Sequence, residues 1–317
     1  MSDMLKLTYR CIQVMLLVSL LIGLVFLTIK PDEKHLYQAS LLKASLLADV
    51  PAPRLILFGG SNIAFGIDSE LMERKLRMPV INDGLHVGLG VAPLLEIKKY
   101  IQPGDIIIIS LEYYNFTDKT AFYGQPQYLA DWIEISPNRI WDLPEPISQM
   151  PRLYTIMLQR KLNRQMQNSL YGPSLNVSRG FYTGDQFNEH GDFVGHLGEN
   201  NTIHFEIDNS VYPVNSIDEA YQFLKSFHEF ALSKSAKVFY EAQAHRQTNC
   251  DLTGMKTIRN FFVRLRNRTT IPLLTDLDQL CLPDDYFYDT PYHLNKQGRE
   301  IRTKRLIESL KSALDPR

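Results

Sequence analysis

The segment from Leu55 to Asn62 places the strongest constraint on how this chain can fold. Four apolar residues run directly into two glycines, a serine (Ser61) and an asparagine, and residues 67–76 then have a helical pattern. A buried strand, a tight turn and a helix are typical of a parallel α/β sheet, in which chemistry collects at the carboxyl ends of strands. Ser61 is therefore a candidate nucleophile. The alternative is a serine that simply caps the following helix.

The rest of the chain continues the alternation of strands and helices. Residues 106–111 form a continuous apolar run rich in isoleucine, which predicts a central strand buried on both faces. Further strands are predicted at 80–82, 237–242 and 271–277, and helices at 91–100, 216–233, 253–267 and 295–313. This alternation predicts an α/β fold in which a parallel sheet is flanked by helices.

An uncharged apolar run from Cys11 to Ile29 precedes this domain. A helix needs about 20 apolar residues to cross a bilayer, and this run is just long enough. It ends in Thr28-Ile29-Lys30-Pro31 without a small-residue cleavage site, so an uncleaved single-span anchor is expected rather than a cleaved signal peptide. Two basic residues stand on each side of the run, and the positive-inside rule therefore leaves the orientation open.

These patterns divide the chain into three parts. Residues 1–30 are the predicted membrane anchor, residues 31–53 a connector, and residues 54–317 the α/β domain. Residues 117–215 interrupt the alternation and are rich in Tyr, Gln, Asn, Gly and Pro, which predicts a loop-rich insertion over the carboxyl edge of the sheet, as a lid or substrate surface. Aromatic side chains in this insertion can stack on sugars, although packing is the preferred explanation for any single one.

Charge and cysteine content exclude several classes of function. The formal net charge is −1, so no basic face is expected and no nucleic-acid partner is predicted. The spacing of His, Cys, Asp and Glu matches no zinc or magnesium pattern, including a set made of Glu112, Asp289 and His293. Neither a metal nor a cofactor is expected. Cys250 and Cys281 can form a disulfide in an oxidising compartment or remain two buried thiols.

A second cluster of polar residues stands just before the last predicted helix. Asp289 and His293 are four residues apart in a turn, close enough to face one place. A serine nucleophile needs a base, and the base needs an acid that fixes its tautomer. The order Ser61, Asp289, His293 is the one found in α/β-hydrolase triads. The alternative is that Asp289 is a turn cap and His293 a residue at the helix start.

The combination of these two clusters resembles the GDSL/SGNH hydrolase superfamily over residues 54–116 and 284–312. Within it the chain looks most similar to membrane-anchored, extracytoplasmic members that act on cell-envelope polymers. The resemblance implies a three-layer, flavodoxin-like sandwich with Ser61 as nucleophile, His293 as base and Asp289 as acid. The Leu-Asn-x-x-Gly pattern that follows His293 at residues 294–298 strengthens the match.

The same resemblance implies an oxyanion hole. The glycine of the second family block falls on Gly88, with Gly84 or the N–H of Val87 as alternatives after a shift of one residue. The third block, which normally supplies an asparagine amide, is absent. Asn115 is the nearest asparagine, and the alternatives at this place are residues 112–114. The chain also departs from the family in its Gly-Gly-Ser-Asn block and in the extra residue between Asp289 and His293.

The resemblance therefore predicts an envelope-anchored serine esterase or O-acyltransferase acting through an acyl-enzyme. Its partners would be an acyl donor, a glycan or polyol acceptor, the membrane and other membrane proteins of an acylation complex. The domain would lie on the extracytoplasmic side. The alternative is a catalytically inactive SGNH-like binding or scaffold subunit of a polysaccharide export or modification complex.

Overall fold

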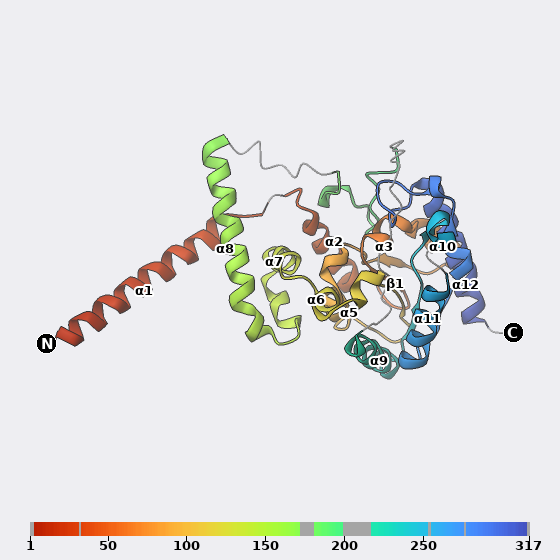
Figure 1. Ribbon diagram of the computed structural model, residues 1–317, viewed down its shortest axis with the longest axis horizontal. Helices are drawn as coiled ribbons and strands as arrows, with labels where there is room; N and C mark the ends of the chain where they lie inside the picture. The colour runs from red at the N-terminus through yellow and green to blue at the C-terminus, as the bar shows by residue number, and fades with distance from the viewer. Residues whose placement is uncertain are drawn as a thin grey trace.

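A computed structural model describes residues 3–31, 33–171, 181–198, 217–252, 255–275 and 277–315 of the chain. Its centre is a parallel four-stranded sheet with the order β2-β1-β3-β4 (Figure 1). The strands are β1 (Leu55–Gly59), β2 (Val80–Asn82), β3 (Ile106–Ser110) and β4 (Lys237–Tyr240). The predicted parallel α/β sheet is confirmed.

The strand order places a topological switch point at β1. In the register of the sheet, Leu55 pairs with Val80 of β2 on one side and with Ile106 of β3 on the other. The order 2-1-3-4 is that of the first strands in flavodoxin-like sheets, whose ligands bind outside the carboxyl ends of the strands at the switch point. A ligand-binding or catalytic site is therefore expected among the residues that follow β1 and β3.

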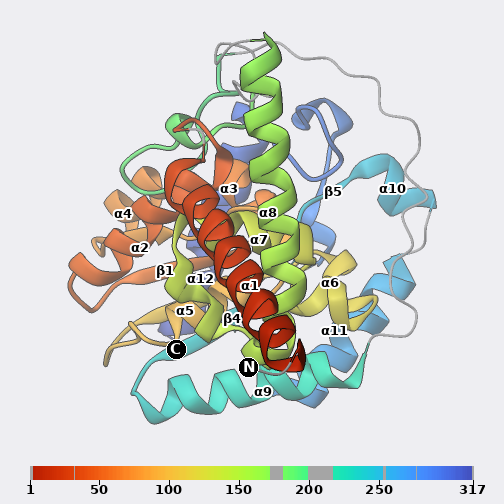
Figure 2. The same cartoon turned by 90° about the vertical axis from the view of Figure 1, so that its left-hand side faces the viewer.

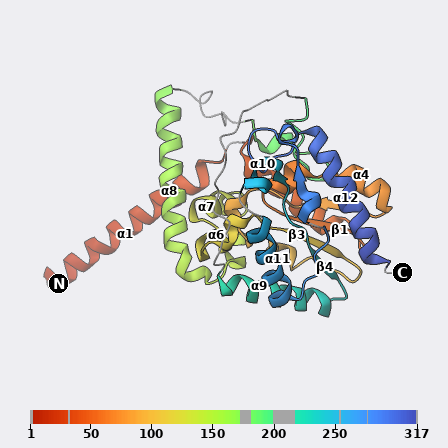
Figure 3. The same ribbon diagram turned by 45° about the vertical axis from the view of Figure 1, so that its right-hand side comes forward.

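Helices cover both faces of the sheet, which gives three layers (Figure 3). The helices of these layers are α2 (Ala39–Asp49), α3 (Ser61–Gly66), α4 (Ser69–Leu76), α5 (Ala92–Ile97), α9 (Asp218–Ser233), α11 (Met255–Thr269) and α12 (Lys296–Leu314). Ile56 and Phe58 of β1 pack with α2, α5, α9 and α11, whereas Leu55 and Leu57 pack with α3, α4 and α12. Successive residues of a strand face opposite sides, so this apolar strand is fully buried.

The predicted strand at 271–277 is wrong in the described residues, where it is reduced to a single bridge. Leu273 pairs with Tyr240, while the carbonyl of Pro272 and the N–H of Leu274 complete the two hydrogen bonds to Tyr240. Pro272 has no N–H to donate to a neighbouring strand, which limits the pairing at this edge. Asp276, inside the predicted range, lies outside the described residues.

The predicted insertion is more helical than its composition suggests. It contains α6 (Lys119–Tyr123), α7 (Pro126–Ile135) and α8 (Pro146–Tyr171), whereas residues 172–180 and 199–216 lie outside the described residues. Trp132 of α7 and Leu153 and Met157 of α8 form a second apolar core beside the sheet domain. Trp132 is therefore a packing residue and not a surface for sugars.

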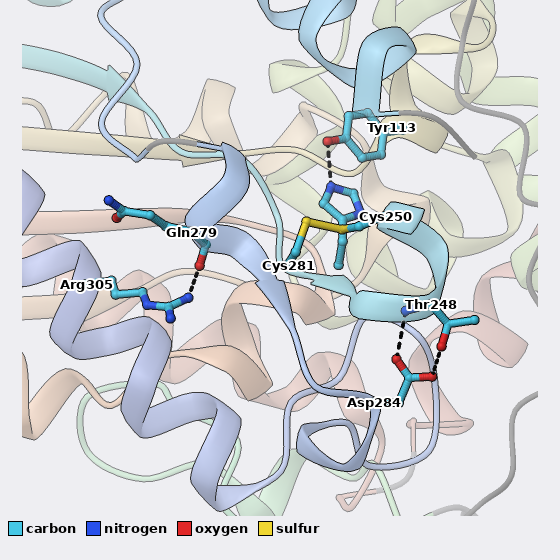
Figure 4. The surroundings of a disulfide bond; sticks show 8 residues. Tyr113, Thr248, Cys250, Gln279, Cys281, Asp284 and Arg305 are labelled. Atoms are coloured by element: carbon cyan, nitrogen blue, oxygen red, sulfur yellow. Dashed lines mark hydrogen bonds between the residues drawn. A yellow bond between two sulfur atoms is a disulfide. The ribbon is translucent and has the colours of Figure 1, made fainter. Parts of the chain in front are cut away.

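The N-terminal helix α1 (Asp3–Thr28) projects away from the domain (Figure 1). It is long and apolar enough to cross a membrane, and none of its most apolar window is buried. At the opposite side of the domain, Cys250 of α10 (Gln247–Leu252) and Cys281 of β6 (Cys281–Leu282) form a disulfide (Figure 4). The sequence had left this pairing open.

Candidate active site

Ser61 lies two residues after the end of β1 and is the first residue of α3. Gly60 occupies the N-cap position, and no side chain caps the helix, so Ser61 does not have the capping role considered from the sequence. The Ser61 side chain is buried at 8 % exposure. Its hydroxyl makes no hydrogen bond to another residue in the described part of the chain. A hydroxyl with no structural partner at a sheet switch point is available for chemistry.

The Asp289–His293 pair has the geometry of an acid and a base. His293 Nδ1 lies 2.7 Å from Asp289 Oδ1, and both side chains are almost buried. The hydroxyl of Thr290 accepts hydrogen bonds from the N–H groups of Tyr292 (3.2 Å) and His293 (3.1 Å). This turn accommodates the extra residue between the acid and the base. Held in this way, Asp289 fixes Nδ1–H and leaves Nε2 as the basic nitrogen.

Phe65 connects His293 to the helix of Ser61. The imidazole of His293 stacks on the ring of Phe65, with centroids 3.8 Å apart and an interplanar angle of 4°. Phe65 is four residues after Ser61 in α3, so the two lie on the same face of the helix about one turn apart. The structure thereby brings the predicted base to the helix face that carries the predicted nucleophile.

Aromatic residues from the second half of the predicted insertion enclose this pair. The rings of Tyr182, Phe193 and His196 lie 4.9, 4.5 and 4.8 Å from that of Phe65. Burial lowers the pKa of His196 to about 4, so it stays neutral beside His293. The segment 181–198 therefore packs around Phe65, the ring on which His293 rests.

Arg302 of α12 fixes the turn that carries Ser61. Its guanidinium forms a fully buried ion pair with Glu241 (3.0 Å) and donates to the carbonyl of Asn62 (2.7 Å). Arg302 also reaches the hydroxyl of Ser110 at 3.2 Å, to which the amide of Asn62 donates at 3.1 Å. The Arg302 guanidinium thus links polar residues at the carboxyl ends of three neighbouring strands, β1, β3 and β4. These bonds hold the start of α3 rigidly against the sheet.

Asp192 organises a second buried network behind the site. Its carboxylate accepts from the N–H and hydroxyl of Ser69 (2.9 and 2.5 Å), from the amide of Asn82 (2.8 Å) and from Arg299 (2.6 Å). The following residue, Phe193, donates its N–H to the carbonyl of Ala64 at 3.0 Å. One residue of the insertion therefore ties α4, β2 and α12 together. No local sequence pattern around Asp192 predicts this role.

The predicted oxyanion donors are engaged elsewhere. The N–H of Gly88 donates to His86 Nδ1 at 3.0 Å, and the N–H of Gly84 donates to Asn82 Oδ1 at 3.0 Å. The amide of Asn115 donates to the carbonyls of Val87 (3.0 Å) and Ala121 (2.9 Å). In this arrangement the three predicted donors hold the loops around the site.

The N–H of Val87, the other alternative for the oxyanion hole, lies near Ser61. A Cβ atom on Gly60 would stand 3.1 Å from Val87 N, and within the described residues this N–H has no partner. His86, the histidine of the same turn, has its pKa lowered to about 4 by burial and, second, by the nearby His293. His86 is thus a neutral acceptor that orients the turn, and its low pKa makes it a poor general base.

Glu112 lies beside Gly60 and Val87, at the switch point. It follows β3 by two residues, and a Cβ atom on Gly60 would stand 2.6 Å from Glu112 Oε1. Burial raises the pKa of Glu112 to about 7, opposed by the N–H of Asn62 and by Arg302. This position is one of the alternatives predicted from the sequence for the third oxyanion donor.

Two further findings bear on the site. The described residues contain no group of three or more His, Cys, Asp and Glu side chains placed to hold a metal ion. Comparisons of the chain with models of protein families and with curated proteins found no match.

Proposed function

We propose that the chain is an SGNH-type serine esterase or O-acyltransferase that uses Ser61, His293 and Asp289. The observation that carries this proposal is the Asp289–His293 pair stacked on Phe65, within one helical turn of an unpartnered buried serine. Ser61 follows β1 at the switch point of the parallel sheet, where such sites form, and the Asp289–His293 pair from a distant turn of the chain stacks on the same short helix.

In the proposed mechanism, Ser61 loses its proton to His293 Nε2 and attacks the acyl carbonyl of an ester; the C–O bond of the ester breaks, and its alcohol leaves with the proton from His293. Asp289 keeps the imidazole in the required tautomer and balances the imidazolium. N–H groups at the start of α3 and of Val87 receive the oxyanion. Water or a sugar or polyol hydroxyl then takes the acyl group from Ser61, with the proton returned through His293. Exclusion of water from the site would favour transfer over hydrolysis.

The proposed location is the extracytoplasmic side of a membrane, with α1 as a single-span anchor and a surface glycan or polyol as acceptor. A disulfide between Cys250 and Cys281 supports an oxidising compartment, because such bonds are rare in the cytosol. Other membrane proteins of an acylation complex would supply the acyl donor.

A scaffold function is the second candidate. It is favoured by the donors of Gly84, Gly88 and Asn115, which are all bound to neighbouring groups. An SGNH-like domain without a complete oxyanion hole would bind a glycan or partner without turnover.

Labelling with a fluorophosphonate separates the two candidates. The full-length chain in detergent is treated with the probe beside Ser61→Ala, His293→Ala and the exposed-site control Ser45→Ala, with each variant's fold checked by circular dichroism. The enzyme proposal expects stoichiometric labelling of the wild type and of Ser45→Ala, lost in the other two. A folded wild type that takes up no label refutes the enzyme and favours the scaffold.

A further inference from the structure

Glu112 places a carboxyl group against the residues on both sides of Ser61. Its side chain is 5 % exposed, its Oε1 stands next to Gly60, and the N–H of Asn62 faces the same carboxyl group. Within the described residues, Oε1 has no hydrogen-bond partner. Burying a polar atom without a hydrogen-bond partner costs free energy of folding. An unpaired carboxyl oxygen beside a candidate nucleophile therefore points to a function for this group.

The surroundings of Glu112 favour the neutral acid. Arg302 of α12 is the cation that acts on it, and it is already paired with Glu241. Tyr182 of the covering segment is buried near the carboxyl group, and the charge of Glu112 would raise the pKa of its phenol further. With a pKa of about 7, the carboxyl group keeps its proton in mildly acidic solution, is about half protonated at neutral pH, and can donate a hydrogen bond in its protonated form.

Glu112 and Val87 converge on one point. Glu112 Oε1 and Val87 N stand 2.6 and 3.1 Å from the place of a Cβ on Gly60. Gly60 is the residue before Ser61, so both groups lie close to the backbone of the candidate nucleophile. The amide of Asn115, the family's expected donor, points to two carbonyls instead.

We infer that Glu112, as a neutral carboxylic acid, donates a hydrogen bond to the oxyanion formed when Ser61 attacks the acyl carbonyl. The inference rests on the proposed function. The acid keeps its proton throughout, and a carboxylic acid held neutral by an apolar site is an established kind of oxyanion donor. Once ionised, Glu112 would instead repel the oxyanion.

The test is the pH dependence of fluorophosphonate labelling in the full-length protein, with Glu112→Gln and Glu112→Ala beside the wild type. Glutamine is a permanent donor of similar shape. We expect the wild-type rate to fall above about pH 7, the Gln variant to keep its rate there, and the Ala variant to lose about 10²–10³-fold.

The outcomes distinguish this inference from the proposed function. A wild type labelled at Ser61 whose alkaline fall persists in Glu112→Gln, or an Ala variant that labels at the wild-type rate, overturns the role of Glu112 and leaves the serine enzyme intact. A folded wild type without any labelling overturns both. Melting temperatures of the variants show whether a lost rate reflects lost fold.

A different observation concerns the outer helix α8, which crosses α1 where the apolar run of α1 ends (Figures 1 and 2). Tyr154 of α8 contacts Phe26 of α1 edge-on at 5.7 Å. Lys161 donates to the carbonyl of Ile29, and Arg164 donates to that of Lys30 at 2.9 Å. The middle of α8 is therefore fixed at the depth at which α1 would leave a bilayer.

The outward surface of the C-terminal half of α8 is apolar and uncharged. Leu162, Met166 and Leu170 recur at every fourth position and are 45, 60 and 68 % exposed. The basic residues of this half, Arg160, Lys161 and Arg164, are instead paired with Asp131 and Glu134 of α7. An exposed apolar ridge beside the end of a membrane span is a mark of an interfacial helix.

The geometry points to the bilayer surface as the occupant of this ridge: α8 lies in the interface of the membrane that α1 spans, with Leu162, Met166 and Leu170 at the boundary between headgroups and acyl chains. Two contacts, a span and an interfacial helix, would hold the domain at a fixed orientation above the membrane.

Depth quenching tests this placement in the full-length chain. A fluorophore is attached to Met166→Cys in a Cys11→Ser background, in nanodiscs of phosphatidylethanolamine and phosphatidylglycerol with a spin-labelled lipid; Lys304→Cys on α12 is the control. We expect several-fold stronger lipid quenching at position 166 than at position 304. Equal quenching at both positions overturns the inference. So does protection of position 166 from the quencher that persists in detergent and increases with protein concentration, because a second copy of the chain would then cover the ridge.

Discussion

The imidazole of His293 lies flat on the ring of Phe65, at 3.8 Å between centroids, while its Nδ1 is 2.7 Å from Asp289. Phe65 belongs to the short helix that begins with Ser61. One helix thus carries both the candidate nucleophile and the surface on which the candidate base rests. Phe65 sets the plane of the His293 ring, and Asp289 sets the rotation of the ring within that plane. Any movement of α3 therefore moves Ser61 and the support of His293 together.

Replacing Phe65 by leucine should therefore reduce reactivity more than stability. The smaller side chain leaves His293 without a flat support, and a misplacement of about 1 Å can cost about 10²-fold in rate. The measurement is the rate of fluorophosphonate labelling. Phe181→Leu is the matched control, because Phe181 touches Phe65 edge-on at 6.2 Å without stacking on the imidazole. Equal rates in the two variants would show that the stack is dispensable.

Asp289→Asn should lower the labelling rate by about 10⁴-fold while the fold is kept, because an amide stabilises the wrong tautomer of His293. Asp285→Asn provides the comparison, since this exposed carboxylate lies four residues away and does not face the imidazole. Circular dichroism and melting temperature verify folding. A rate within tenfold of the wild type for Asp289→Asn would remove the acid from the proposed triad.

The sequence predicted the parts of the fold that depend on local patterns. The continuous apolar run at 106–111 predicted a buried central strand, and β3 spans Ile106–Ser110. The predicted final helix at 295–313 is α12, with Asn295 as its N-cap. The predicted strand at 271–277 was wrong, because its one proline limits the hydrogen bonds that set a strand at the sheet edge.

The site was predictable only in part. The order and residue types of Ser61, Asp289 and His293 predicted a possible triad, and the structure pairs Asp289 with His293 through a local turn. Arg302 and Asp192 could not be recognised, because their partners are more than 60 and 100 residues away in the chain and only folding brings them together. A charged residue directly after a buried strand, as at Glu241, is the one local signal that the Arg302 pair gives.

Asp192→Asn should destabilise the folded protein by about 3–5 kcal/mol, the typical cost of breaking a buried ion pair by removing one partner. The substitution removes the charge that Arg299 contacts at 2.6 Å and weakens bonds to Ser69 and Asn82. Chemical denaturation in detergent measures the loss. Asp185→Asn changes an exposed carboxylate on the same segment and should cost less than about 1 kcal/mol. Similar losses in both variants would contradict the central role of Asp192.

Removal of the Cys250–Cys281 disulfide should lower stability by about 4 kcal/mol, because it closes a loop of 31 residues. The bond lies beside Tyr113, whose hydroxyl is 2.8 Å from Nε2 of the buried His245 (Figure 4). The double variant to serine is compared with Cys11→Ser, which changes a free exposed cysteine. Denaturation midpoints that are unchanged by reducing agent in the wild type would contradict this contribution.

The last prediction concerns how Glu112 links stability to pH. Its folded pKa, about 7, exceeds its ordinary value of 4.5, so between these pH values the folded protein holds a proton that the unfolded chain has lost. The stabilisation by this group is therefore complete below pH 4.5 and is lost as the pH rises through 7, a change of about 3 kcal/mol.

Glu112→Gln removes this titration, so the stability of the variant relative to the wild type should increase by up to that amount between pH 4.5 and 8. Asp83, whose pKa burial also raises to about 7, titrates in both proteins and cancels in the difference. Denaturation in detergent at a series of pH values measures it. A difference that stays constant across this range would mean that Glu112 is already ionised at low pH, and a donor role in the oxyanion hole would then fail on stability data alone, without any assay of activity.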